Sequence, residues 1–180
     1  VSAAGLVARL DDRTARVVVV GQGYVGLPVA MRAAAVGFDV VGLDVSVERV
    51  SALRAGRSYV TDVGDDELAA ALASGYHPTD DPDVGPFDVA VITVPTPLRE
   101  GLPDLSHVEA ATEALARALR PGALVVLEST TYPGSTEELV RPILERSGLR
   151  AGADFFLGYS PERIDPGNPT WGLVNTPKVV

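Results

Sequence analysis

Three glycines lie at a spacing that suits the binding of a dinucleotide pyrophosphate. Residues 21–26 are Gly-Gln-Gly-Tyr-Val-Gly, between a β-branched apolar run and a helical pattern. In a strand–turn–helix unit, Gly21 allows the tight turn, Gly23 lets the backbone approach the pyrophosphate, and Gly26 lets the helix pack close to the sheet. N–H groups at the helix start bind the phosphates. A glycine-rich turn without a ligand is the alternative. The cofactor-binding residues expected here are Gly21, Gly23, Tyr24, Val25 and Gly26.

A carboxylate follows the second apolar run. Asp44 lies 23 residues after Gly21, and an acidic residue about 20 residues on bonds the adenine ribose hydroxyls in such a site. Because a carboxylate repels a 2′-phosphate, the sequence favours NAD over NADP. Arg49, one turn into the next helix, could reach a 2′-phosphate, stack on adenine or pair with Asp44. For Asp44 itself, a plain helix cap is the alternative.

Two later segments combine hydroxyl groups with prolines. Residues 93–97 are Thr-Val-Pro-Thr-Pro, and residues 128–134 are Glu-Ser-Thr-Thr-Tyr-Pro-Gly. Each follows an expected strand, and open α/β sheets bind ligands outside the carboxyl ends of their strands. We therefore expect both segments in the cleft of the glycine-rich turn, although a merely connecting loop is the alternative for 93–97. The cofactor contacts expected from them are Thr93, Pro95, Thr96, Thr130 and Thr131.

The elements that must position these residues alternate along the chain. Apolar runs predict strands at 16–20, 38–43, 87–94, 123–127 and 155–159, separated by helical patterns. Such alternation predicts βαβ units and a Rossmann-like doubly wound parallel sheet in three layers, α/β/α, with strand order 3-2-1-4-5-6.

Local signals set the expected helix ends. Ser-x-x-Glu spacings predict capping boxes at Ser106 and Ser135. Either Asp65 or Asp66 is expected to cap a third helix. The last helix, from 135 to 146, contains Pro142, which should kink it.

Composition excludes several classes of protein. The chain has 180 residues, a net charge of −9 and no cysteine, which excludes a disulfide scaffold, a thiolate metal site and a cysteine nucleophile within it. The acidic balance argues against nucleic-acid and anionic-membrane partners. No apolar run approaches the ~20 residues of a membrane span. His77, expected in a loop, and His107 have no second ligand at metal spacing, so we expect no metal site.

Both ends of the chain carry further expectations. We expect residues 1–14 to be an N-terminal extension and residues 15–180 to form the doubly wound α/β domain. Residues 1–10 do not have a signal-peptide pattern, so a cytoplasmic protein is expected. The strand-like end at 178–180 suggests a fragment of a longer protein.

Together and in this order, these segments resemble the NAD-binding domain of the UDP-glucose/GDP-mannose dehydrogenase family. The resemblance rests on 21–28 with Asp44, on 93–97, on 129–134 and on 160–168, and it runs from about Arg16 to the end. Residues 160–168 are Ser-Pro-Glu-Arg-Ile-Asp-Pro-Gly-Asn, most similar to the branch that oxidises UDP-N-acetylglucosamine or UDP-N-acetylmannosamine. The UDP-glucose branch usually carries Phe where Arg163 stands.

The resemblance implies a chemistry. The family oxidises a sugar CH₂OH to carboxylate in two NAD-dependent steps, through a thiohemiacetal and a thioester on a cysteine. It implies that Glu162 does acid–base work in hydrolysis, that Thr131 helps place water, and that Glu162 and Arg163 contact the UDP-sugar. Since this chain has no cysteine, we expect it to bind NAD but to be inactive alone. Homo-oligomers are expected only for the full-length protein.

Two other readings remain open. One is a non-catalytic NAD-binding module, in which Glu162 and Arg163 are a solvated charge pair. The other is a β-hydroxyacid dehydrogenase relative, which would need a catalytic lysine, and the chain has only Lys178. Trp171 either anchors the proline-rich tail or lines a substrate site.

Overall fold

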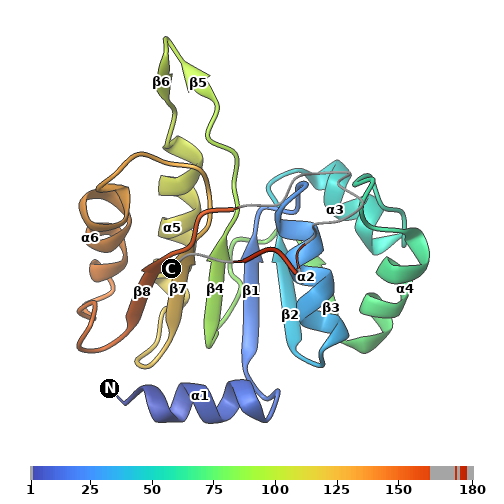
Figure 1. Ribbon diagram of the computed structural model, residues 1–180, viewed down its shortest axis with the longest axis horizontal. Helices are drawn as coiled ribbons and strands as arrows, with labels where there is room; N and C mark the ends of the chain where they lie inside the picture. The colour runs from blue at the N-terminus through green and yellow to red at the C-terminus, as the bar shows by residue number, and fades with distance from the viewer. Residues whose placement is uncertain (1, 163–172, 174, 178–180) are drawn as a thin grey trace.

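The core of the molecule is a single parallel sheet. A computed structural model describes residues 2–162, 173 and 175–177. Six strands pair in the order β3-β2-β1-β4-β7-β8, and every pairing is parallel. Counted along the chain, this is the expected order 3-2-1-4-5-6 (Figure 1). The strands are β1 Arg16–Val20, β2 Asp39–Leu43, β3 Tyr76–Thr79, β4 Val89–Ile92, β7 Leu124–Leu127 and β8 Phe156–Tyr159.

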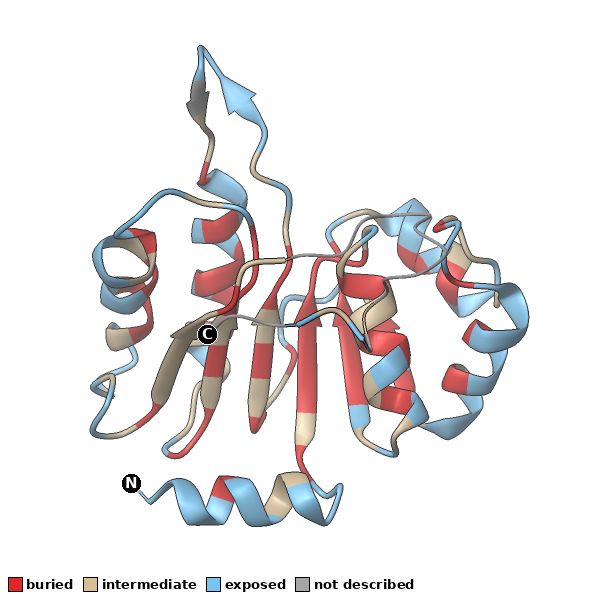
Figure 2. Cartoon of the chain, viewed as in Figure 1, coloured by how far each residue is buried: buried red, intermediate tan, exposed pale blue. Residues whose placement is uncertain are grey.

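Helices cover both faces of the sheet. Alternate residues of β1 enter opposite cores: Val17 and Val19 pack with α2, α3 and α4, whereas Val18 and Val20 share a core with α5 and α6. This alternation follows from the period of two in a strand, and it makes β1 buried along most of its length (Figure 2). The three-layer α/β/α prediction is confirmed. The helices are α1 Ala3–Asp11, α2 Gly26–Ala35, α3 Val47–Arg54, α4 Asp65–Ser74, α5 Ser106–Ala118, η1 Thr136–Val140 and α6 Arg141–Glu145.

The edge strand β3 corrects one expectation. His77 was expected in a loop, but it lies in β3, with its exposed ring 3.5 Å from Asp39. Its neighbour Pro78 has no N–H to donate, which an edge strand tolerates because only one side is paired. The segment is a strand because β2 offers it a register from Val40 to Leu43.

The starts of three helices differ from the caps that the sequence predicted. Neither expected capping box forms: Ser106 is the first residue of α5, and its N–H donates to the Asp104 side chain at 3.0 Å. Ser135 makes no capping bond, and its hydroxyl donates to the Tyr132 carbonyl instead. The cap of α4 is Gly64 rather than an aspartate, with three acidic residues in the first turn, where they stabilise the helix dipole.

The last helix changes type instead of continuing as one kinked α-helix. Residues Thr136–Val140 form the π-helical turn η1, and α6 begins at Arg141 with Pro142 in its first turn. The Arg141 N–H still donates to the Thr136 carbonyl, so α6 continues directly from η1, and the change of helix type falls immediately before Pro142.

Two features lie beyond the ends of the strands, one at each end of the sheet. The residues set apart as an extension form α1, which lies across the amino ends of the strands with Leu6 buried (Figure 1). A hairpin of β5 Leu98–Arg99 and β6 Leu102–Pro103 projects at the opposite end. Within the described residues, no helix is long and apolar enough to cross a membrane.

Candidate cofactor site

The glycine-rich turn is packed against the end of β4. Gly21 has φ +92°, and a Cβ on it would lie 2.9 Å from the Thr93 carbonyl oxygen. A Cβ on Gly26 would lie 1.8 Å from the Gly21 carbonyl oxygen and 2.4 Å from Thr93 Oγ1. The Thr93 hydroxyl also donates to the carbonyls of Val20 and Gly21. Both glycines are therefore required by the protein itself, as the tight turn and the close helix packing predict.

Gly23 differs from its neighbours. A Cβ on Gly23 would meet no protein atom within 4 Å, so the space beside its backbone is open. The adjacent helix α2 begins after Val25 with no side-chain cap and no acidic residue in its first turn. An uncapped helix start carries unpaired N–H groups and a partial positive charge. An open backbone beside such a helix start can bind a pyrophosphate.

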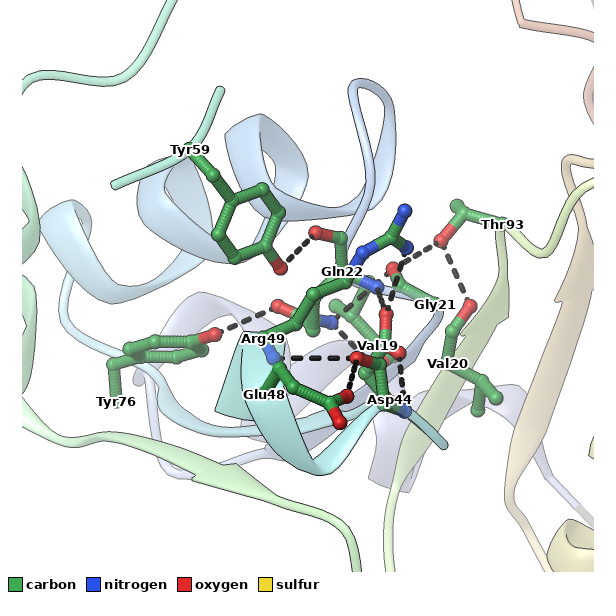
Figure 3. Close-up of polar contacts among 11 residues, drawn as sticks. Val19, Val20, Gly21, Gln22, Asp44, Glu48, Arg49, Tyr59, Tyr76 and Thr93 are labelled. Carbon is green, nitrogen blue, oxygen red and sulfur yellow. Dashed lines mark hydrogen bonds and ion pairs between the residues drawn. The ribbon is translucent and has the colours of Figure 1, made fainter. Parts of the chain in front are cut away.

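Asp44 is buried directly beneath the turn. Its side chain is 6% exposed, and its Oδ2 accepts the N–H of Gln22 while its Oδ1 accepts the N–H of Ser46, both at 2.9 Å (Figure 3). Arg49 Nη1 lies 3.5 Å from Oδ2, so Arg49 pairs with Asp44 in this structure while also lining the cleft. The cap of α3 is Ser46 rather than Asp44. A carboxylate has about four acceptor positions, so Asp44 retains capacity for a ribose hydroxyl.

A cleft of about 300 Å³ joins these groups at the carboxyl ends of the strands. Eleven of its lining residues were predicted from the sequence; the other three, Val94, Glu128 and Ser129, were not assigned roles. All three belong to the two segments that the sequence placed in this cleft, 93–97 and 128–134, and Ser129 Oγ donates to the Val94 carbonyl at 2.8 Å. The predicted lining residues are Gly21, Gly23, Tyr24, Val25, Asp44, Arg49, Thr93, Pro95, Thr96, Thr130 and Glu162.

The remaining predicted residues lie elsewhere. Gly26 is buried behind the turn. Thr131 is absent from the cleft lining, and its hydroxyl donates to Ser135 Oγ at 2.5 Å. Arg163 and Trp171 lie outside the described residues. Among the residues that are described, no group of three potential ligands could hold a metal ion.

Comparison with known proteins identifies the family. Residues 15–180 match the UDP-glucose/GDP-mannose dehydrogenase family, NAD binding domain. The chain belongs to this family. As its NAD-binding domain, it takes NAD as cofactor.

Individual relatives cover most of this chain. It is 42% identical over 168 residues to a UDP-N-acetyl-D-glucosamine 6-dehydrogenase of Pseudomonas aeruginosa, matching 91% of this chain and 39% of the relative. It is 37% identical to a UDP-N-acetyl-D-mannosamine dehydrogenase of Pyrococcus horikoshii, matching 92% and 40%. A solved UDP-D-ManNAc dehydrogenase structure from that organism superimposes with a TM-score of 0.80 at 39% identity, over 84% of this chain and 37% of the other. The chain thus spans about two fifths of these relatives' length.

Proposed function

We propose that this chain is the cofactor half of a UDP-N-acetylhexosamine 6-dehydrogenase, whose whole protein oxidises a sugar CH₂OH to carboxylate in two NAD-dependent steps. The observation that carries the proposal is the cleft that joins Asp44 and the glycine-rich turn to Glu162. Residues 160–168, which contain Glu162, resemble the UDP-N-acetylhexosamine branch. The two enzymes named above, which act on such sugars by their names, support the same substrate class.

The strand order supports a direction for NAD in this cleft. Asp44 follows β2, the glycine-rich turn follows β1, Thr93 and Thr96 follow β4, and Thr130 follows β7. With Asp44 on the adenine ribose and the pyrophosphate at Gly23, the nicotinamide would extend toward the ends of β4 and β7. When bound there, NAD supplies the hydride acceptor for both oxidations.

Glu162 is the proposed general base of the hydrolysis step. It lines the same cleft as Thr130, and it follows β8, the strand that pairs with β7. A carboxylate there can accept a proton from the water that attacks an acyl intermediate. Thr131 does not line the cleft itself but follows Thr130, which does; we propose that it helps to place that water, since its bond to Ser135 leaves its oxygen available as an acceptor. Arg163 would contact the UDP-sugar.

The proposal also assigns a limit to this chain. Its covalent route needs a thiolate, and the sequence has no cysteine. We therefore expect the 180-residue chain to bind NAD without oxidising a UDP-sugar. The reacting cysteine would be contributed by the part of the whole protein that corresponds to the rest of its relatives.

Calorimetry and spectrophotometry test both halves of the proposal. Titration of the chain with NAD should give saturable heat, whereas UDP-N-acetylglucosamine or UDP-N-acetylmannosamine with NAD should release no NADH. Steady NADH production by the purified chain would contradict the covalent mechanism. No heat with NAD would contradict the site itself.

In the whole protein, Glu162→Gln should slow hydrolysis and let the thioester accumulate, because an amide cannot accept the proton of water. Mass spectrometry of the denatured protein would detect the added acyl group. Glu109→Gln, on the exposed face of α5, is the matched control and should leave turnover unchanged. Thr131→Ala should cost less than Glu162→Gln, since another water can partly replace a positioning hydroxyl.

A further inference from the structure

Gln22, the middle residue of the glycine-rich turn, is held at every polar atom. Its side chain is fully buried. Its N–H donates to Asp44 at 2.9 Å, and its carbonyl accepts the Tyr59 hydroxyl at 2.6 Å. Its amide oxygen accepts the Tyr76 hydroxyl at 2.7 Å, and its amide nitrogen donates to the Val19 carbonyl at 2.8 Å (Figure 3). These bonds tie the turn to β1, to Asp44 and to two tyrosines from later segments of the chain.

The contact between Gln22 and Tyr76 is built into the sheet. The Tyr76 side chain, from edge strand β3, is 1% exposed, and burial raises the pKa of its phenol so that it remains a neutral donor. Gly42 of β2 lies beneath the pair, where a Cβ would come within 2.6 Å of both Gln22 Oε1 and the Tyr76 hydroxyl. Any other residue at position 42 would push the two side chains apart.

Tyr59 holds the same residue through the backbone. It lies between α3 and α4, and burial, with a smaller contribution from the charge of Asp44, raises the pKa of its phenol to about 12. The Arg49 guanidinium lies over its ring, 5.6 Å from the centroid. Because the carbonyl of Gln22 and the N–H of Gly23 belong to one planar peptide unit, a bond to that carbonyl also fixes the direction of the Gly23 N–H.

We propose that Tyr59 and Tyr76 are positioning residues, which act through Gln22 to hold the glycine-rich turn in its pyrophosphate-binding conformation before the ligand arrives. Neither tyrosine lines the cleft, so neither needs to touch NAD. A turn that must be ordered during binding loses affinity in proportion to the fraction of molecules in the competent conformation. The inference rests on the proposed pyrophosphate site at Gly23.

The first test removes single hydroxyls and compares two ligands. Tyr59→Phe keeps the aromatic ring under Arg49 but releases the Gln22 carbonyl. It should weaken binding of ADP-ribose about five- to tenfold, the usual value of one hydrogen bond. Adenosine has no pyrophosphate, so the affinity of Tyr59→Phe for adenosine should stay within about twofold of that of the wild-type chain, since the Tyr59 ring and Asp44 remain. Tyr132→Phe is the control, because Tyr132 is 46% exposed and outside the cleft lining.

The second test separates positioning from stability. Tyr76→Phe leaves the buried amide oxygen of Gln22 without its donor, so it should lower both stability and ADP-ribose affinity. Gln22→Leu combined with Tyr76→Phe removes the unpaired amide oxygen and should recover part of the stability, although the Val19 carbonyl loses its side-chain donor. Affinity for ADP-ribose should stay reduced in the double variant, because the side chain that ties the turn to the Val19 carbonyl is gone.

The outcomes distinguish the two proposals. If the unchanged chain does not bind ADP-ribose, the pyrophosphate site is wrong and the positioning role falls with it. If it binds ADP-ribose but Tyr59→Phe weakens the binding of adenosine and of ADP-ribose equally, the positioning role alone is wrong. The same holds if Tyr59→Phe weakens the binding of neither ligand. If affinity recovers together with stability in the double variant, Tyr76 has only a packing role. Urea unfolding of each variant ensures that affinities are compared between folded proteins.

Discussion

Two aspartates are buried at opposite ends of the same sheet, and their partners differ in kind. Asp88 precedes β4 at the amino ends of the strands, with its side chain 3% exposed. Its carboxylate pairs with the Arg9 guanidinium at 2.7 Å, with that of Arg120, and with the Arg16 N–H at 2.9 Å. Two cations thus neutralise this charge and tie α1 and the end of α5 to the sheet.

Asp44, at the carboxyl ends, is held mainly by neutral donors. The N–H groups of Gln22 and Ser46 bind its two oxygens, and the single guanidinium, that of Arg49, is 3.5 Å away and half exposed. Backbone donors fix the position of this carboxylate without neutralising it. A carboxylate that keeps its charge and an acceptor position can bind a ribose diol and repel a 2′-phosphate, whereas one neutralised by two cations holds the fold together.

Asp88→Ala should have the largest effect, on stability alone. It leaves two guanidinium groups and the part-buried Arg16 N–H without their acceptor, and it should cost about 3 kcal/mol, the lower end for a broken buried charge pair because both arginines reach water. Urea unfolding measures the loss. NAD affinity of the folded protein should change less than about twofold; a larger loss of NAD binding would mean that the two ends of the sheet are coupled.

Asp44→Ala should act mainly on binding. Loss of a charge-assisted bond to the ribose is worth about 2 kcal/mol, so NAD should bind roughly 30-fold more weakly. NADP should lose much less, since its 2′-phosphate no longer meets a carboxylate. Calorimetric titration with both cofactors checks the difference. Equal losses for NAD and NADP would show that Asp44 does not discriminate between them.

Replacing one arginine partner of each aspartate should have a smaller effect on the free energy of unfolding. Arg9→Ala removes one of two cations from Asp88 and should destabilise the protein by about 1 kcal/mol. Arg49→Ala removes a longer, half-exposed contact and should change the free energy of unfolding by less than about 0.5 kcal/mol. Urea unfolding of both variants measures the contrast. Comparable losses would mean that the two aspartates are held alike.

Lowering the pH should reduce the difference in the free energy of unfolding between the wild-type protein and Asp88→Asn. Burial alone would raise the pKa of Asp88, but the Arg16 N–H and the guanidinium groups of Arg120 and Arg9 outweigh it and lower the pKa below its ordinary 3.8. The unfolded chain therefore takes up the proton first. The stability that Asp88 contributes is complete above the unfolded pKa of about 3.9 and is lost as pH falls through the lower folded value. Urea unfolding from about pH 6 to about pH 3 tests this; a constant difference would contradict it.

Much of the site was predictable because its signals are local. The β-branched run of β1 and the spacing of Gly21, Gly23 and Gly26 are legible in a short window of sequence. The rule that ligands bind at the carboxyl ends of parallel strands then brought Thr93, Thr130 and their neighbours into one cleft.

The rest depended on contacts between distant residues. The segment Tyr76–Thr79 is a strand because β2 pairs with it. Its own sequence contains Pro78, which argues against a strand when read alone. Asp104 replaced Ser106 as the capping acceptor because it lies where the first N–H of α5 can reach it. The partners of Gln22 lie 37 and 54 residues further along the chain, and no periodicity in the sequence reveals such pairs.

The tight fit around Gly42 has a consequence for how this sequence can drift. Positions 22, 42 and 76 belong to three different elements, yet each limits what the others accept. Replacing Gln22 or Tyr76 alone strands a buried polar atom, and enlarging Gly42 is blocked while both remain. We therefore expect relatives that carry a side chain at position 42 to differ at position 22 or 76 as well. Substitutions at the three positions should accordingly be correlated across the family.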